Sequence, residues 1–345
     1  MRSYNQINQA FIYLFFILVS VLFGFKSEIV GADASRYIKI FFQFHDVDIY
    51  WFIDRIKNLN LNEIGFLIFV KLSSEIYLDS FFFFFTVSLS ITFLIYFSYK
   101  SLVVSNNIHH DLFFISVLLL SSWYITETTN GIKQGLALSI LYFGLCKQLV
   151  NSNYNRFIIL FFTSCLFHIS IILILPFLLI IRFRLKYVYI FWFISLFFYI
   201  IGLNELIVKT FSEYFDIKVY TIIKEYGLKE NPGNWVGLQW EFVLYTFVFG
   251  LLPIILKILN LIKLEHKTNL EFTIKLYLML SIVYFTFGFG PWSNRFAIIC
   301  WFFIPILQAS LFANVKFSKK SLQLISIILM LVSINYFIFY RLQFL

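Results

Sequence analysis

Residues 126–176 read TETTNGIKQGLALSILYFGLCKQLVNSNYNRFIILFFTSCLFHISIILILP. Most of this stretch is apolar enough to lie within a lipid bilayer, yet it contains Glu127, Lys133 and His168. Ionisable residues at membrane depth are costly, so such a residue usually faces a protein interior or a water-filled cavity. The stretch therefore predicts membrane helices that carry part of a functional site.

The composition of the whole chain indicates a membrane protein. Of its 345 residues, 61% are hydrophobic and 13% are charged, and the mean hydropathy is +0.85. Its apolar runs are about 15–25 residues long, near the ~20 that a helix needs to cross a bilayer, whereas barrel strands would alternate over about 10. We therefore expect an all-α, polytopic membrane bundle with about ten or eleven crossings, some short or broken, as one domain over residues 1–345.

The net charge of +9 does not indicate nucleic-acid binding, because the basic residues cluster in short loops between apolar runs. This is the positive-inside pattern of membrane proteins, and it places the N-terminus in the cytoplasm. Residues 26–61 and 204–239 then form the two larger external loops. The expected spans are 8–25, 80–98, 112–125, 132–150, 187–203, 242–262, 274–288, 296–312 and 322–340.

Two segments need a different interpretation. The run 157–181 has basic residues on both sides, so both flanks should be cytoplasmic and a single crossing is excluded. We expect two short helices that turn back near His168, at the outer tip.

Glu63, Lys71, Glu75 and Asp79 recur at multiples of four and predict a polar stripe along one helix. That helix either lies in the membrane interface, which we favour, or crosses with its stripe towards the bundle.

The predicted topology brings ionisable residues to the outer level. Lys133 and Gln134 begin a helix after Asn130–Gly131, where the lysine either snorkels to the headgroups or binds an anion. Arg295 follows GFGPWSN, a helix-breaking sequence, and is either an interfacial anchor or a bidentate phosphate ligand.

Three further positions are candidates for proton transfer. Asp33, with Arg36 close by, follows the first span and is either a solvated loop residue or a contact to a sugar hydroxyl. Glu127 is a second candidate base, and the sequence does not choose between these carboxylates. His168 is either a buried, hydrogen-bonded residue or a base or phosphate ligand.

Several motifs are absent from the sequence. It has no Gly-rich phosphate loop, no GxSxG and no DxD-type pair, which disfavours a soluble nucleotide-sugar transferase or an ATP-driven pump. His109, His110 and Asp111 lack the further ligands that a metal would need, so we expect no metal and no cofactor. The three cysteines have no paired spacing, and we interpret them as packing residues.

Four segments resemble the EpsG family of bacterial exopolysaccharide proteins, which are related in role to Wzy-type polysaccharide polymerases. GADASRYIKIFF resembles the family's Gly-x-Asp…Tyr element, and NGIKQGLALSILYFGL resembles a motif written around Arg-Gln-x-x-Ala. FTSCLFHISIILILP is similar to its Phe-His-x-Ser…Pro element, and NRFAIICWFFIPIL is similar to its C-terminal Arg region. Lys133 departs from the pattern, in which we expect Arg, so the charge is kept and the bidentate geometry is lost.

The resemblance implies a polymerase of the bacterial inner membrane, with a GT-C-like architecture, that makes O-antigen, capsule or exopolysaccharide. It would join undecaprenyl-pyrophosphate-linked repeat units on the outer face, with membrane lipid, a flippase and chain-length regulators as partners. A hydroxyl of the acceptor sugar would attack the donor's anomeric carbon through an oxocarbenium-like transition state. Lys133, Arg295 and His168 would stabilise the departing pyrophosphate, and Asp33 or Glu127 would be the base.

Other functions remain open from the sequence alone. A membrane O-acyltransferase would need its histidine to be reachable from the cytoplasm, whereas His168 is expected outside. A lipid-linked-sugar flippase or transporter would favour internal repeats, and none is found. A ligase that transfers finished polymer to an acceptor would share the whole site with a polymerase.

Overall fold

The computed structural model describes residues 2–25, 32–48, 63–103, 107–150, 152–225, 237–262, 267–316 and 318–337. Within these ranges the chain is helical and has no strand, apart from an isolated antiparallel bridge between Ile262 and Val315. This confirms the all-α prediction. Parts of the predicted external loops, 26–31, 49–62 and 226–236, lie outside the described residues.

The chain divides into two compact units. Unit 1 comprises Met1–Ile172, Gln308–Ala313 and Phe317–Leu345, and unit 2 comprises Leu173–Leu307 and Asn314–Lys316. The 3-10 helix Ile169–Arg182 and helix α16 (Ile304–Asn314) each contain a boundary between the units. Each unit is described by itself below.

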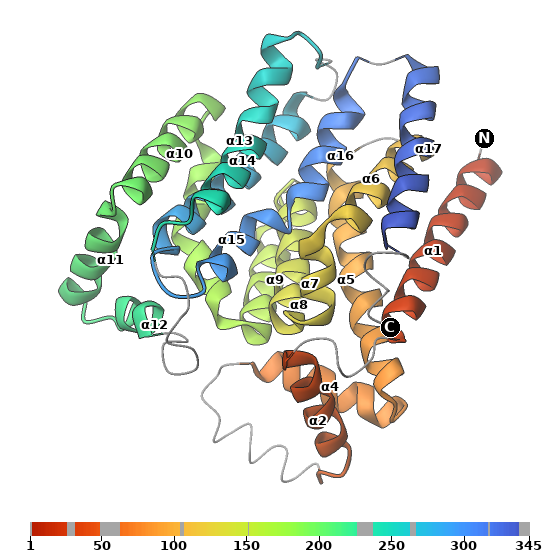
Figure 1. Ribbon diagram of the computed structural model, residues 1–345, viewed down its shortest axis with the longest axis horizontal. Coiled ribbons are helices and arrows are strands. Elements are labelled where there is room, and N and C mark those ends of the chain that lie inside the picture. Colours follow the sequence, from red (N-terminus) through yellow and green to blue (C-terminus); the bar gives the residue numbers. More distant parts are fainter. Residues whose placement is uncertain are drawn as a thin grey trace. The chain divides into compact units, whose positions relative to one another are not determined.

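Unit 1 is built from nine of the labelled helices (Figure 1). They are α1 (Arg2–Gly24), α2 (Ala32–His45), α4 (Ile64–Ile76), α5 (Ser80–Leu102), α6 (Ile108–Leu120), α7 (Ser122–Thr129), α8 (Ile132–Phe143), α9 (Tyr154–Phe167) and α17 (Lys319–Tyr336). A short π-helix, Gly144–Leu149, follows α8. Helix α1 packs along α5, α17 packs on α6, and α4 contacts both α2 and α9.

Short polar side chains fix where several of these helices begin. The carboxylate of Asp79 accepts a hydrogen bond from the Phe81 amide at 2.6 Å, and Asn107 accepts one from the His109 amide at 3.1 Å. Such N-caps satisfy backbone donors that have no partner within the helix. The apolar run after Asp79 then forms the 23-residue helix α5, whose length suffices to cross a bilayer.

Unit 2 contains α10 (Leu185–Ile200), α11 (Leu203–Tyr214), α12 (Val219–Glu225), α13 (Trp240–Ile258), α14 (Lys267–Phe287) and α15 (Ser293–Trp301). Helix α14 packs against α10, α11, α13 and α15. Its end is fixed by side chains: the Asn204 amide donates to the carbonyls of Phe285 and Thr286, at 2.9 and 3.3 Å. The Tyr199 hydroxyl donates to the Gly288 carbonyl at 3.1 Å.

Five helices in the described ranges are long and apolar enough to cross a membrane, and the number rises to seven if two bent pairs count as single spans. The bent pairs are α6 with α7, at 66°, and α10 with α11, at 94°. The multi-pass prediction is confirmed. The predicted count of ten or eleven is larger because 154–167, 169–182 and 320–336 form apolar helices of 10–17 residues.

The structure also changes details of the sequence prediction. The segment predicted as the first external loop contains helix α2, and the segment predicted as the second contains α12 and nearly all of α11. The predicted stripe helix covers only Ile64–Ile76: Glu63 is its N-cap, and Asp79 is the N-cap of α5. The run 157–181 is broken at His168, as expected, although its second half is a 3-10 helix. The reversal of direction at this break stays a prediction.

The three cysteines are buried. Cys146 and Cys300 have no exposed surface and Cys165 is 7% exposed, and none forms a disulfide. The Cys300 thiol donates a hydrogen bond to the Ala297 carbonyl at 3.1 Å, and the burial of all three agrees with their interpretation as packing residues.

Candidate functional site

Lys133 is held inside unit 1 by a carboxylate. Its Nζ donates to Glu63 Oε2 at 2.6 Å, and the lysine side chain is only 12% exposed. The same nitrogen lies 5.2 Å from the ring centroid of Phe66 and 5.6 Å from that of Tyr37, within cation–π range. The lysine is therefore a positioned cation rather than a snorkelling side chain.

Tyr37 connects Lys133 to the residues predicted after the first span. The guanidinium of Arg36 lies 5.6 Å from the Tyr37 ring and 3.6 Å from the Asp33 carboxylate. Tyr37 itself is 4% exposed, and its burial and then the nearby Asp33 raise the pKa of its phenol, which keeps it neutral. We call this group, Asp33, Arg36, Tyr37, Glu63, Phe66 and Lys133, the Tyr37 cluster.

The Tyr37 cluster combines two cations, Arg36 and Lys133, with two carboxylates, Asp33 and Glu63, around a buried aromatic ring. The side chains of Asp33, Arg36 and Glu63 are 35%, 58% and 40% exposed, so they remain accessible to a ligand. This arrangement can bind an anion at the cations and accept a proton at a carboxylate.

Glu127 occupies a different environment, and it is 1% exposed. A Cβ at Gly131 would collide with the Glu127 carboxylate, and one at Gly135 would collide with its backbone carbonyl. The carboxylate therefore lies against the N-terminus of α8, where the helix dipole favours negative charge. This geometry fixes the N-cap of α8, Gly131, which lies two residues before Lys133. Gln134 next to it is also buried, at 5% exposed.

His168 lies at the break between α9 and the 3-10 helix, and its Nδ1 is 2.6 Å from the Ser170 hydroxyl. Helix α4 reaches this end of α9, because a Cβ at Gly65 would lie 2.9 Å from the Phe167 ring. Gly65 precedes Phe66 of the Tyr37 cluster, and Phe167 precedes His168. The start of α4, which carries Phe66, and the end of α9, which precedes His168, therefore lie side by side.

Arg295 lies in unit 2, whereas the other predicted site residues lie in unit 1. Its guanidinium lies 5.5 Å from the Trp292 ring, in a corner between α14 and α15. Trp292 has a left-handed backbone, with φ of 57°, and Gly290 packs against the backbone of Ile223 in α12. The predicted helix break is confirmed, and a common site for Arg295 and Lys133 stays a prediction.

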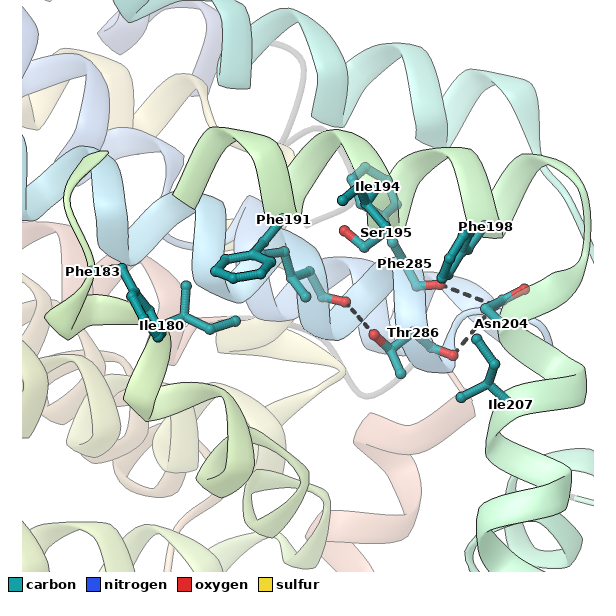
Figure 2. Close-up of a pocket in the computed structure, with 11 residues that line it drawn as sticks. Ile180, Phe183, Phe191, Ile194, Ser195, Phe198, Asn204, Ile207, Phe285 and Thr286 are labelled. Atoms are coloured by element: carbon teal, nitrogen blue, oxygen red, sulfur yellow. Dashed lines mark hydrogen bonds between the residues drawn. The ribbon is translucent and has the colours of Figure 1, made fainter. Parts of the chain in front are cut away.

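Unit 2 also contains an apolar cavity of about 330 Å³ on the side of α14 (Figure 2). Its walls come from α10, α11, α14 and the end of the 3-10 helix, and Phe183, Phe191, Phe198 and Phe285 contribute aromatic rings. Asn204 lies at one end of the cavity, beside Thr286 (Figure 2). Asn204 caps two carbonyls at the end of α14 and also lines the cavity. The chain continues from this end of α14 to Arg295.

Among the described residues, no three His, Cys, Asp or Glu side chains are close enough to hold a metal ion. The sequence does not reveal that Glu63, Tyr37 and Phe66 surround Lys133. It places Glu63 only on a polar stripe, and the one local signal is that this acidic residue directly precedes an apolar helix.

Comparison with known proteins gives one family match. A sequence profile of the EpsG family matches residues 9–344, nearly the whole chain. No curated protein and no solved structure shows significant similarity to this chain.

Proposed function

This chain belongs to the EpsG family of membrane proteins, which is implicated in exopolysaccharide synthesis, and from that premise we propose that it is a polysaccharide polymerase. The substrate is an oligosaccharide repeat unit linked to undecaprenyl pyrophosphate. The reaction joins repeat units by glycosyl transfer on the outer face of the bacterial inner membrane.

The Tyr37 cluster is the observation that carries this proposal. Lys133 supplies a fixed, largely buried ammonium group, and fixed charge in a water-poor site stabilises an anion more strongly than charge in bulk water. Asp33, 35% exposed, supplies a carboxylate that an acceptor sugar can reach. Cation and base therefore lie in one group of packed helices.

The proposed reaction forms one bond and breaks one. The acceptor hydroxyl oxygen bonds to the anomeric carbon of the donor, while the bond from that carbon to the pyrophosphate oxygen breaks. The hydroxyl proton passes to the Asp33 carboxylate, and the pyrophosphate leaves as an anion that needs no proton. Lys133 and Arg36 stabilise this anion, and His168 donates a hydrogen bond to it.

Glu127 has a supporting role in this proposal. Its carboxylate is 1% exposed and lies against the first turn of α8, so an acceptor sugar would have to displace packed backbone to reach it. We therefore assign the proton transfer to Asp33, and we assign to Glu127 and Gln134 the positioning of Lys133.

Unit 2 carries a further cation and a place for lipid. Arg295, in its corner beside Trp292, stays a predicted phosphate ligand. The apolar cavity has the size of a small-molecule site and is lined by aromatic and aliphatic side chains, which suits part of an isoprenoid chain (Figure 2). Thr286 lies at the cavity end of α14, close in sequence to the corner that holds Arg295.

The test uses alanine variants in the polysaccharide-producing host. Lys133→Ala, His168→Ala and Arg295→Ala are each expected to accumulate single lipid-linked repeat units in place of polymer, at normal protein levels. Lys209→Ala is the control, because Lys209 is 48% exposed and pairs only loosely with Glu213, at 3.9 Å. Full-length polymer in all three site variants would contradict the proposal.

The same experiment separates the alternatives. A ligase variant would leave long polymer on its lipid carrier, since polymerisation would be intact. A flippase variant would confine the repeat units to the inner leaflet, where an enzyme added outside spheroplasts cannot reach them.

A further inference from the structure

We propose that Glu63 is an internal competitor for the anion-binding site on Lys133. In the unliganded protein, the Glu63 carboxylate binds the ammonium group of Lys133. In the proposed reaction, the donor pyrophosphate binds this same ammonium group. Glu63 is then a positioning residue, which acts through Lys133, and the donor must displace it to bind. This inference rests on the proposed function.

The contact between the two residues has the geometry of a bound anion. Glu63 Oε2 lies 2.6 Å from Lys133 Nζ, a close charge-assisted hydrogen bond between a carboxylate and an ammonium group. The other close neighbours of the ammonium group described here, the Phe66 and Tyr37 rings, attract it without accepting a conventional hydrogen bond. A ligand with several anionic oxygens can therefore replace Glu63 and engage more of the three ammonium donors.

Lys133 and Glu63 differ in solvent exposure, and this difference decides which side chain moves when a ligand binds. Lys133 is 12% exposed and lies between two aromatic rings, while Glu63 is 40% exposed. Displacing Glu63 moves its carboxylate towards solvent, where it is hydrated, and leaves the lysine in place. If Glu63 were as deeply buried as Lys133, its carboxylate would resist displacement, because it would remain desolvated and would lose its ionic partner.

The backbone of Glu63 indicates that its side chain serves this contact. Glu63 is the N-cap of α4 with φ of 73°, in the left-handed region that non-glycine residues rarely adopt. Its side chain makes no capping hydrogen bond to α4 and reaches instead to Lys133. The protein thus keeps glutamate at a position where glycine would suit the backbone better and where other residues would cap the helix.

The test measures binding of inorganic pyrophosphate to the full-length protein in nanodiscs of zwitterionic lipid. Glu63→Gln is expected to bind pyrophosphate about three- to tenfold more tightly than wild type, because removing a competing anion raises the fraction of competent sites. Lys133→Ala is expected to lose this binding. A merely structural role for Glu63 would lower stability and would not raise affinity.

Two further variants make the result decisive. Glu75→Gln is the matched control, because Glu75 pairs with Lys71 in the same helix, away from Lys133, and should leave affinity unchanged. Glu63→Gly removes the carboxylate and suits the left-handed backbone, so it should also raise affinity even if the glutamine variant folds poorly. Thermal unfolding checks the fold of each variant.

The outcomes distinguish the two proposals. Unchanged or weaker binding in both Glu63 variants, with binding lost in Lys133→Ala, would overturn the competitor and leave the proposed function standing. Wild-type binding in Lys133→Ala would overturn the anion site on Lys133, and with it both proposals for this residue.

Discussion

At the scale of single residues, Lys133 illustrates how packing converts an ordinary surface charge into a chemical group. The Phe66 and Tyr37 rings and the Glu63 carboxylate hold one ammonium group at distances of 5.2, 5.6 and 2.6 Å. A free lysine would spend rotamer entropy on binding an anion, and this lysine has already lost that entropy on folding.

Substitutions of Lys133 that keep its positive charge should therefore affect polymer synthesis much less than substitutions that remove it. Lys133→Arg keeps the cation and its stacking on the rings, so polymer yield should stay within about threefold of wild type. Lys133→Met keeps the length without the charge and should lose about 10²-fold of the synthesis rate, as for the loss of one preorganised donor. Polymer length and yield on gels, normalised to protein level, measure both effects. Equal loss in the two variants would show that shape, rather than charge, matters at this position.

The sequence predicts Lys133, Arg36 and Asp33 as site residues because the expected topology brings them to the outer level. It could not identify Glu63 as the partner of Lys133, since the two are 70 residues apart and meet only because of how α4 packs. Local periodicity places Glu63 on a stripe but says nothing about the neighbour that the stripe meets.

At the scale of elements, the apolar runs were the most predictable feature. The run predicted at 80–98 became α5, Ser80–Leu102, because a long apolar run follows a good N-cap, Asp79. Helix α2 was missed because Ala32–His45 mixes polar and apolar residues and reads as a loop when only long apolar runs are sought. Bends such as the 94° angle between α10 and α11 depend on what each helix buries, which no single run encodes.

The end of α14 provides a test at this scale. Asn204, 4% exposed, caps two carbonyls there, and Asn204→Ala should destabilise the protein by about 1–3 kcal/mol because buried acceptors lose their donor. The control is Asn335→Ala, whose amide makes an exposed bond to the Leu331 carbonyl and should change stability by less than about 0.5 kcal/mol. Unfolding curves in mixed micelles give both values. Similar losses in the two variants would contradict the capping role.

At the scale of the whole molecule, loop charge predicts the orientation in the membrane. Basic residues flank the cytoplasmic ends of the predicted spans, and this bias is what directs insertion. Three apolar segments shorter than a full span made the number of crossings hard to predict, because length and composition alone do not tell a short span from a helix that enters and returns.

Reporter fusions test this orientation. Alkaline phosphatase needs disulfides that form outside the cytoplasm, so a fusion after Asp216 should be active and a fusion after Ser152 inactive. Both residues are exposed and lie in turns with left-handed backbones, at φ of 52° and 55°, which makes them a matched pair. Activity at both positions, or at neither, would contradict the predicted topology between them.

The burial of all three cysteines has a practical consequence. Cys146, Cys165 and Cys300 are at most 7% exposed, so membrane-impermeant maleimides should find little to react with on the native protein. The natural sequence can then serve as its own blank for site-directed spin labelling. One nitroxide near Lys133 and another near Arg295 would measure the distance between the two cations directly, by pulsed electron paramagnetic resonance, without first removing any natural thiol.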